Sequence, residues 1–290
     1  MASASSEDDS TSDEDGESER KRPRLGIPDD LQNLFSSRVP DDPGLHGGRN
    51  RRVAHVDGNY ATLAYLPVVA TPQWRKRAEA CSSLLRRLAP AGSEVHVIDA
   101  SAGPGWHISL GPLLLLRVQF VEPLLQKLRQ LAGGLSLPLG SQAVSFDDSI
   151  EVLSSLDGGR YFAAVRVSEA SEAWLRPLAA SVLSAAKDLS LVPAAAESPI
   201  EDLRLHVSLA WTVADLQPGL AKASASCQES SFGRSWTLSE QTAKADTSEG
   251  LLARPRAINV RVGERINALA LPWARRLVDQ SSEEEEEDPP

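Results

Sequence analysis

Histidine and serine alternate in two short stretches of this 290-residue chain. The first stretch carries His107 and Ser109, and the second carries His206 and Ser208. An imidazole has an ordinary pKa of about 6.5, so it can accept or release a proton close to neutral pH. A hydroxyl can donate a hydrogen bond to a phosphate oxygen and stabilise developing negative charge. These four residues are therefore our candidates for acid–base chemistry on a phosphate ester.

Each stretch has the composition of a β-strand, which explains how its histidine and serine could act together. Successive side chains of a strand point to opposite faces, so His107 and Ser109 share one face while Ile108 lies on the other. The second stretch repeats this arrangement, with Val207 on the apolar face. The apolar face can pack into a core while the polar face lines a groove. Two imidazoles at one groove can serve as a general base and a general acid.

The remainder of the chain alternates between strand and helix patterns. Apolar residues spaced by three and four predict helices, and strict alternation predicts strands. Helices fall between non-neighbouring strands twice, which predicts an α+β fold with two lobes related by a pseudo-twofold axis. Each lobe would give one His-x-Ser strand to a central cleft. The expected strands are 58–67, 94–98, 106–110, 142–146, 150–153, 161–167, 205–211, 257–262 and 266–271, and the expected helices are 74–88, 118–131 and 175–189.

Both ends of the chain are strongly acidic. Residues 1–19 hold eight acidic residues and no basic one, and residues 281–290 hold six acidic residues and no basic one. Runs of like charge stay solvated and bury no core. A further stretch rich in Ser, Ala and Gln lacks sustained periodicity and is interpreted as a loop insertion. We therefore expect a disordered leader at 1–48, a single domain at 49–279 with the insertion at 217–250, and a disordered acidic tail at 280–290.

The charge of the body differs from that of the whole chain. The net charge is −10, but without the fourteen terminal acids the body has 26 acidic and 30 basic residues, a net charge of +4. A mildly basic body permits an anionic ligand without requiring one. Hydrophobic residues make up 41% of the chain, which is enough for a substantial core.

Several features indicate the compartment. Cys81 and Cys227 are too few for a disulfide framework, which favours a reducing environment. Met1 is followed by serines and acids rather than by a signal peptide, and the apolar run Leu113–Leu116 is far too short to span a bilayer. We therefore expect a soluble intracellular protein with no membrane partner. Arg20–Arg24 fits a nuclear import signal, although a solvated basic cluster has the same composition.

Other interpretations of the histidines stay open. Both could be satisfied core residues, although that reading fits one histidine on a strand better than two matching His-x-Ser strands. A zinc site needs three or four ligands, and His46, His55 and His96 show no ligand-like spacing, so we expect no metal. We expect His55 and His96 on the surface or in loops. Arg204 is interpreted as a solvated arginine rather than a phosphate contact.

Four stretches together resemble the 2H phosphoesterase superfamily, which is marked by paired His-x-Ser/Thr-x strands in two pseudo-symmetric lobes. The resemblance covers about residues 50–275, apart from the proposed insertion. Within the superfamily the chain is similar to the nucleases that trim the 3′ end of U6 small nuclear RNA. The matching stretches are Gly58–Thr62, His107–Leu110, His206–Trp211 and Arg261–Pro272.

This resemblance implies a 3′→5′ exonuclease that removes uridines by metal-independent transesterification and often leaves a 2′,3′-cyclic phosphate. RNA is then the partner, no cofactor is required, and the protein works in the nucleus in mRNA splicing; we also expect a monomer. The family roles make His107 the base and His206 the acid, although the residues alone do not assign them, and make Ser109 and Ser208 substrate-binding. Two alternatives remain, namely another 2H enzyme such as a 2′,3′-cyclic phosphodiesterase, and a non-catalytic RNA-binding or spliceosome-associated module.

One position departs from the family's pattern. The family commonly carries an aromatic residue just before the second motif, where it stacks on the terminal base. Ile200 occupies the matching place, and no Tyr, Phe or Trp lies between Ala194 and Leu205. Stacking is worth about 1–3 kcal/mol per base, so terminal-base binding should be weaker or differently built. Three other aromatic residues could supply the platform: Tyr60, Tyr161 and Trp211.

Overall fold

The structure is a computed structural model, and all the residues that it describes fall in one compact unit of the chain. It describes residues 58–135, 142–155, 159–191, 203–223, 225–230, 233–238 and 250–274. The expected leader at 1–48, the acidic tail at 280–290 and Ile200 lie outside the described residues, as do His46 and His55. None of the described helices is long and apolar enough to cross a membrane.

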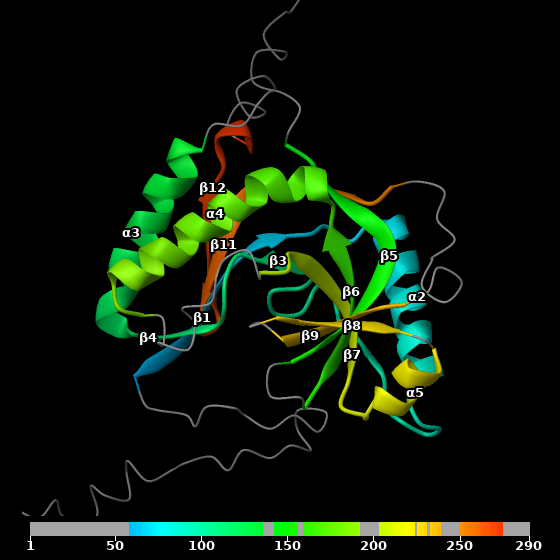
Figure 1. Cartoon of the computed structure of the whole chain (residues 1–290). Coiled ribbons are helices and arrows are strands. Elements are labelled where there is room, and N and C mark those ends of the chain that lie inside the picture. The colour runs from blue at the N-terminus through cyan, green and yellow to red at the C-terminus, as the bar shows by residue number, and fades with distance from the viewer. Residues whose placement is uncertain are drawn as a thin grey trace, which may run out of the picture. The chain divides into compact units, whose positions relative to one another are not determined.

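A single large antiparallel sheet runs through this unit (Figure 1). Its main path has the order β12-β11-β1-β3-β7-β6-β5-β9-β8, with β10, β2 and β4 pairing to β5, β7 and β1. The α+β class expected from the sequence is therefore confirmed. The strands are β1 Asn59–Pro67, β2 His96–Val97, β3 His107–Ser109, β4 Leu114–Arg117, β5 Val144–Ser154, β6 Tyr161–Val167, β7 His206–Thr212, β8 Ser226–Ser230, β9 Gly233–Thr237, β10 Leu252–Ala253, β11 Ala257–Val262 and β12 Arg265–Ala270.

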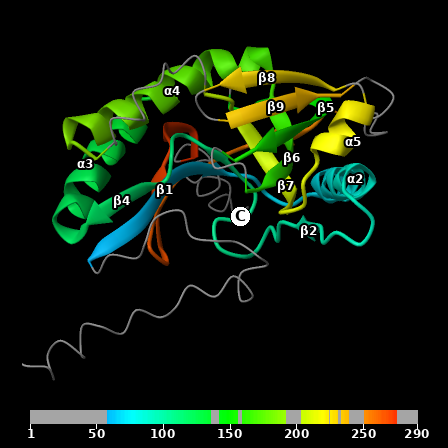
Figure 2. The same ribbon diagram turned by 60° about the horizontal axis from the view of Figure 1, so that its bottom comes forward.

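Four helices are described: α2 Pro72–Leu88, α3 Val118–Gly134, α4 Glu169–Asp188 and α5 Gln217–Lys222. In α2, Thr71 caps the first turn by accepting the Trp74 N–H, and Pro72 occupies a first-turn position where its missing N–H costs nothing. Helix α2 packs against β6 and β7, whereas α3 packs against β11, β12 and α4. Figure 2 shows α5 lying beside α2.

One row of aliphatic side chains identifies the core face at the middle of the sheet. Ile108 of β3 is in register with Leu66 of β1 on one side and with Val207 of β7 on the other. Val207 is in turn in register with Val165 of β6. All four side chains are fully buried, which stabilises the fold by about 1.5–3 kcal/mol each. Their neighbours along each strand must point to the opposite face.

The structure differs from the sequence-based expectation in several elements. Strands 142–146 and 150–153 are one long strand, β5, whose pairing to β6 shifts register between Phe146 and Ile150. Strands β4 and β10 were not predicted.

The loop prediction for 217–250 is wrong over its described parts, which form α5 and the β8–β9 hairpin. The hairpin is held by pairing of β9 with β5 and by Trp236, which packs near Tyr161 in the core. Helix α5 approaches α2 so closely that a Cβ on Gly219 would lie 2.0 Å from the Leu88 carbonyl oxygen. The contacts of β9 with β5 and of α5 with α2 join segments far apart in the sequence, so local periodicity cannot predict them.

Candidate active site

The two histidines and two serines predicted from the sequence lie on neighbouring strands. His107 and Ser109 are on β3, His206 and Ser208 are on β7, and all four are half-buried. Because Ile108 and Val207 are in register on the core face, the four polar residues share the opposite face. Extending this antiparallel register sets His107 across from Ser208 and His206 across from Ser109. Each imidazole is thus beside the hydroxyl of the other strand.

Both imidazoles are oriented by a backbone carbonyl two residues earlier. The Nδ1 atom of His107 lies 2.8 Å from the Gly105 oxygen, and that of His206 lies 2.7 Å from the Arg204 oxygen. A carbonyl oxygen can only accept, so in each ring Nδ1 carries the hydrogen and donates it. The Nε2 atom of each neutral ring then keeps its lone pair. Both histidines therefore offer Nε2 for proton transfer.

The loop before β3 delivers the Gly105 carbonyl through a conformation that requires glycine. Gly105 has a φ of 59°, in the left-handed region. A Cβ at this position would lie 2.2 Å from the Ala100 carbonyl oxygen. The ring of His107 is also held by Tyr65, whose ring meets it edge-on at a centroid distance of 5.1 Å. The orientation of His107 is thus fixed from both the loop and β1.

Burial lowers the pKa of both imidazoles. In His107 the hydrogen bond to Gly105 opposes this effect, since it favours the protonated ring. In His206 burial is again the main cause, the bond to Arg204 opposes it, and the positive charges of His107 and Arg204 lower the pKa further. The two rings are therefore close enough to repel each other when both are charged. Such repulsion disfavours the doubly protonated pair, so one ring can stay neutral while the other is protonated, as a base and an acid require.

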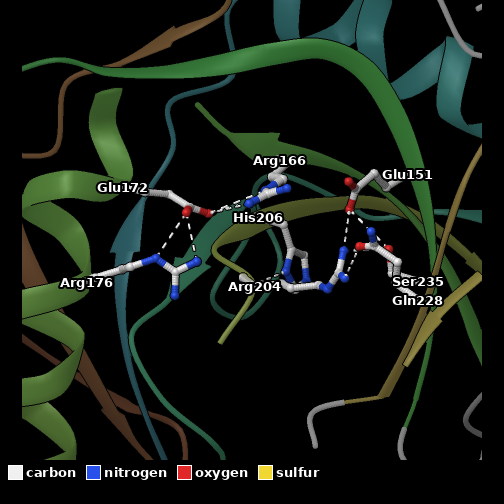
Figure 3. Close-up of polar contacts among 8 residues, drawn as sticks. All are labelled: Glu151, Arg166, Glu172, Arg176, Arg204, His206, Gln228 and Ser235. Carbon is white, nitrogen blue, oxygen red and sulfur yellow. Dashed lines mark hydrogen bonds and ion pairs between the residues drawn. The ribbon is translucent and has the colours of Figure 1, made fainter. Parts of the chain in front are cut away.

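The side chain of Arg204 binds residues of the strands toward the β8 edge of the sheet (Figure 3). Its Nη1 donates to Ser235 Oγ at 2.8 Å and lies 3.7 Å from Glu151 Oε2, and its Nη2 donates to Gln228 Oε1 at 2.6 Å. The side chain is only 18% exposed. The expectation of a solvated arginine is therefore wrong, because three partners on β5, β9 and β8 enclose it. Since the Arg204 carbonyl accepts from His206, these contacts also hold the imidazole.

A second charged cluster lies on the other side of His206 (Figure 3). Glu172 of α4 accepts from Arg176 at 2.8 and 3.0 Å and from Arg166 at 3.4 Å, and its side chain is 7% exposed. Arg166 of β6 is in register with His206 and so lies on the same face. Neither Arg166 nor Glu172 was predicted from the sequence as a site residue. The signal for Arg166 was a lone charge in the otherwise apolar 161–167 strand.

The other candidate ligands and nucleophiles lie elsewhere. His96 is in β2 rather than in a loop, with its ring stacked on Trp211 at 4.2 Å between centroids. Cys81 is fully buried, and burial raises the pKa of its thiol to about 12, so it is a poor nucleophile. Cys227 is exposed. Within the described ranges, no three His, Cys, Asp or Glu side chains are grouped to hold a metal ion.

Comparison with known proteins gave consistent matches. The family described as "HVSL: Uncharacterised conserved protein" matches residues 25–269. Two proteins named U6 snRNA phosphodiesterase 1 are each 28% identical: that of Danio rerio over 204 residues, 69% of this chain and 67% of the relative, and that of Mus musculus over 196 residues, 66% of each. The chain thus spans about two thirds of these relatives. The structure of Kluyveromyces marxianus Usb1 aligns with 73% of this chain and 97% of its own, at 16% identity and a TM-score of 0.46.

Proposed function

The chain belongs to the HVSL family, and from that premise we propose that it is a 3′→5′ RNA exonuclease that trims the uridine-rich 3′ end of U6 snRNA. The names of its relatives support this substrate. The observation that carries the proposal is the pair of imidazoles on β3 and β7, each oriented through Nδ1 by a carbonyl and each beside a serine. Arg166 and Arg204 add positive charge near this face.

The proposed reaction uses the RNA's own 2′-hydroxyl as nucleophile. His107 Nε2 takes the 2′-hydroxyl proton while the 2′-oxygen forms a bond to phosphorus and the bond from phosphorus to the 5′-oxygen breaks. Protonated His206 gives its proton to that leaving 5′-oxygen. Ser109 and Ser208 donate hydrogen bonds to the phosphate oxygens, where negative charge increases in the transition state. The first turnover gives a shortened RNA with a 2′,3′-cyclic phosphate and a released nucleoside with a free 5′-hydroxyl, and each later turnover releases a nucleoside 2′,3′-cyclic phosphate.

The proposal also includes a pseudo-twofold relation between two lobes, with a His-x-Ser strand from each at a central cleft. The antiparallel pairing of Ile108 with Val207 supports it, because a two-fold axis between these residues exchanges His107 with His206 and Ser109 with Ser208. The matching Nδ1 contacts support it too. Such symmetry suits a reaction in which a proton is taken on one side of phosphorus and given on the other.

Incubation of the full chain with 3′-oligouridylated RNA in EDTA tests the proposal. We expect stepwise loss of 3′ nucleotides, unaffected by the chelator, and a cyclic phosphate that blocks 3′ end-labelling until acid opens it and a phosphatase then removes the resulting monophosphate. Cleavage that stops in EDTA and returns with a divalent metal would contradict the mechanism. Turnover only of nucleoside 2′,3′-cyclic phosphates would identify a different 2H enzyme. Binding without any single-turnover cleavage would identify a non-catalytic RNA-binding module.

Nuclear location, a monomeric state and a domain at 49–279 complete the proposal. The U6 snRNA substrate and the basic cluster Arg20–Arg24 support the nucleus. If the cluster is an import signal, a fluorescent fusion in which its four basic residues are replaced by alanine should lose nuclear enrichment. Sedimentation equilibrium should return the 31.2 kDa mass of one chain.

A further inference from the structure

The three aromatic residues suggested as base platforms occupy different places in the sheet. Tyr161 is 7% exposed and packs near Trp236 in the core. Tyr60 is 42% exposed, but it is six residues before Leu66 on β1 and so points to the core-face side at the end of the strand. Trp211 is half-buried on β7. Only Trp211 among these three can share the face of the catalytic histidines.

A β-bulge turns Trp211 toward that face. In a regular strand Trp211 would share the face of Val207, since the two are four residues apart. The pairing of β6 with β7 matches Ala164 to Ser208 but Ala163 to Ala210, which leaves Leu209 as an extra residue on β7. Beyond the bulge the alternation is reversed, and Trp211 pairs with Phe162 on the face of Ser208. The bulge thus adds an aromatic ring to the face that carries the histidines.

Trp211 is the centre of an aromatic row across three strands. His96 of β2 is in register with it and stacks on it, with 4.2 Å between centroids and 20° between ring planes. Phe162 of β6 is in register with it on the other side. The guanidinium of Arg160 lies over the Phe162 ring, 5.7 Å from its centroid. All four side chains are half-buried rather than enclosed.

We propose that the row of His96, Trp211, Phe162 and Arg160 is a stacking subsite for a base of single-stranded RNA that neighbours the scissile phosphate. The proposal rests on the RNA nuclease function proposed above. Aromatic rings stack on unpaired bases, and a cationic side chain beside them attracts the phosphate backbone, in both cases without sequence preference. Trp211 follows Ser208 by three residues on the same strand face, so the row is continuous with the proposed phosphate site. One base can stack on the exposed part of the row while its phosphate reaches the serines.

The occupant is a nucleotide rather than an apolar peptide because of the groups around the row. The guanidinium of Arg160 lies over Phe162 at one end of the row, so an anionic backbone is attracted to that end. The histidines and serines beside Trp211 are polar, which suits a phosphate next to the base. An aromatic row that served packing alone would have no affinity for RNA bases.

A double-mutant cycle between protein and RNA tests the subsite. Binding of a fluorescently labelled oligouridine is measured in the His107→Ala background, so that cleavage does not deplete the ligand. A set of oligonucleotides lacks one base at a time while keeping every ribose and phosphate. We expect Trp211→Leu to weaken binding of intact RNA about tenfold, which is about 1.4 kcal/mol. One abasic position should cause the same loss, and the two changes together should cost no more than either.

Two matched variants separate stacking from folding. Trp211→Phe keeps an aromatic ring, so it should retain most of the RNA affinity. If Trp211 only stabilises the fold, the RNA affinity of each variant should instead fall in proportion to its melting temperature. Tyr60→Leu removes an exposed aromatic residue on the opposite side of the same sheet and should change nothing. In the wild-type background, Trp211→Leu should raise KM on oligouridine while leaving kcat within twofold.

The possible outcomes distinguish the subsite from the function on which it rests. If oligouridine is cleaved normally and no abasic position is coupled to Trp211, the subsite is wrong and the nuclease function stands. If the wild-type chain neither binds nor cleaves oligouridine, the nuclease function fails and takes the subsite with it. Equal losses in Trp211→Phe and Trp211→Leu would also overturn the subsite.

Discussion

At the residue scale, the Nε2 atoms of His107 and His206 are the two groups that we propose exchange protons with RNA. We expect His107→Ala and His206→Ala each to lower the single-turnover cleavage rate by about 10²–10⁴-fold, because each removes one proton transfer. The two act as a unit, so the double variant should be little slower than either single one. Melting temperatures should confirm that the variants are folded. A near-normal rate in either single variant would show that its histidine moves no proton.

The pH dependence follows from burial, which lowers the pKa of both histidines below the ordinary 6.5. A neutral base and a protonated acid are both needed, so kcat/KM should follow a bell with its maximum below pH 6.5. On unfolding, each pKa returns to about 6.5, so the unfolded chain binds more protons as the pH falls. The stability contributed by these groups is therefore complete above pH 6.5 and is lost between that pH and their lower folded pKa values. His206→Ala should flatten this loss in a series of pH-dependent melts.

Gly105 offers a test of how the His107 imidazole is held. Its left-handed φ and the 2.2 Å approach of a Cβ to the Ala100 oxygen make Gly105→Ala strained. We expect a loss of stability of about 1–3 kcal/mol and a lower kcat, because the displaced carbonyl no longer fixes Nδ1. The control is Gly134→Ala at the end of α3, where a Cβ meets nothing within 4 Å. An unchanged kcat in Gly105→Ala would show that the Gly105 carbonyl is not needed to orient His107 for catalysis.

At the element scale, the β8–β9 hairpin and β5 hold Arg204, whose carbonyl orients His206. Arg204→Ala should lower kcat about tenfold with little change in KM, because it loosens that carbonyl and leaves Glu151 without its cationic partner. Loss of the positive charge should also raise the pKa of His206 and move one limb of the pH profile upward. Arg204→Lys keeps the positive charge but cannot bind Ser235 and Gln228 through two nitrogens at once. Its pH profile should therefore resemble that of the wild type, while its kcat should stay low.

Arg176→Ala is the matched control for Arg204. Arg176 also pairs with a buried glutamate, Glu172, but its carbonyl is on α4 and orients no imidazole. The control should lose stability without a change in the pH profile. If both variants lower kcat alike and leave the pH profile alone, Arg204 has no specific part in positioning His206.

The elements recovered from the sequence are those with strong local patterns. Helices α2, α3 and α4 carry apolar residues at helical spacing, β6 is an almost wholly apolar run, and β7 begins with alternating polar and apolar residues. Strands β8 and β9 are short and polar, and they form because β9 pairs with β5, which lies some eighty residues earlier. Such a partner cannot be seen in a local window.

The same limit applies to the candidate site. His107, Ser109, His206 and Ser208 could be chosen from the sequence because each pair is a local motif with a chemical meaning. The roles of Arg204 and Arg166 depend on which strands become neighbours. The face of Trp211 depends on a bulge at Leu209 that local alternation did not predict.

At the scale of the whole molecule, the charge of the chain ends should oppose RNA binding. Residues 1–19 and 281–290 carry fourteen acidic residues and no basic one, while the body has a net charge of +4. Deleting residues 1–48 together with 281–290 should keep the melting temperature and cleavage. It should leave RNA affinity unchanged or raised, with the largest gain at low salt, where repulsion is least screened.

The family match begins at residue 25 and so includes half of the proposed leader at 1–48. A second truncation can therefore test where the domain begins. It removes only 1–24 and 281–290, which deletes the fourteen terminal acids and leaves 25–48 in place, with four further acids and Arg38. If residues 25–48 bury no surface, both truncated proteins should have the same melting temperature. A lower melting temperature only in the shorter protein would move the start of the domain from residue 49 to near residue 25, because residues that bury no surface cannot stabilise a fold.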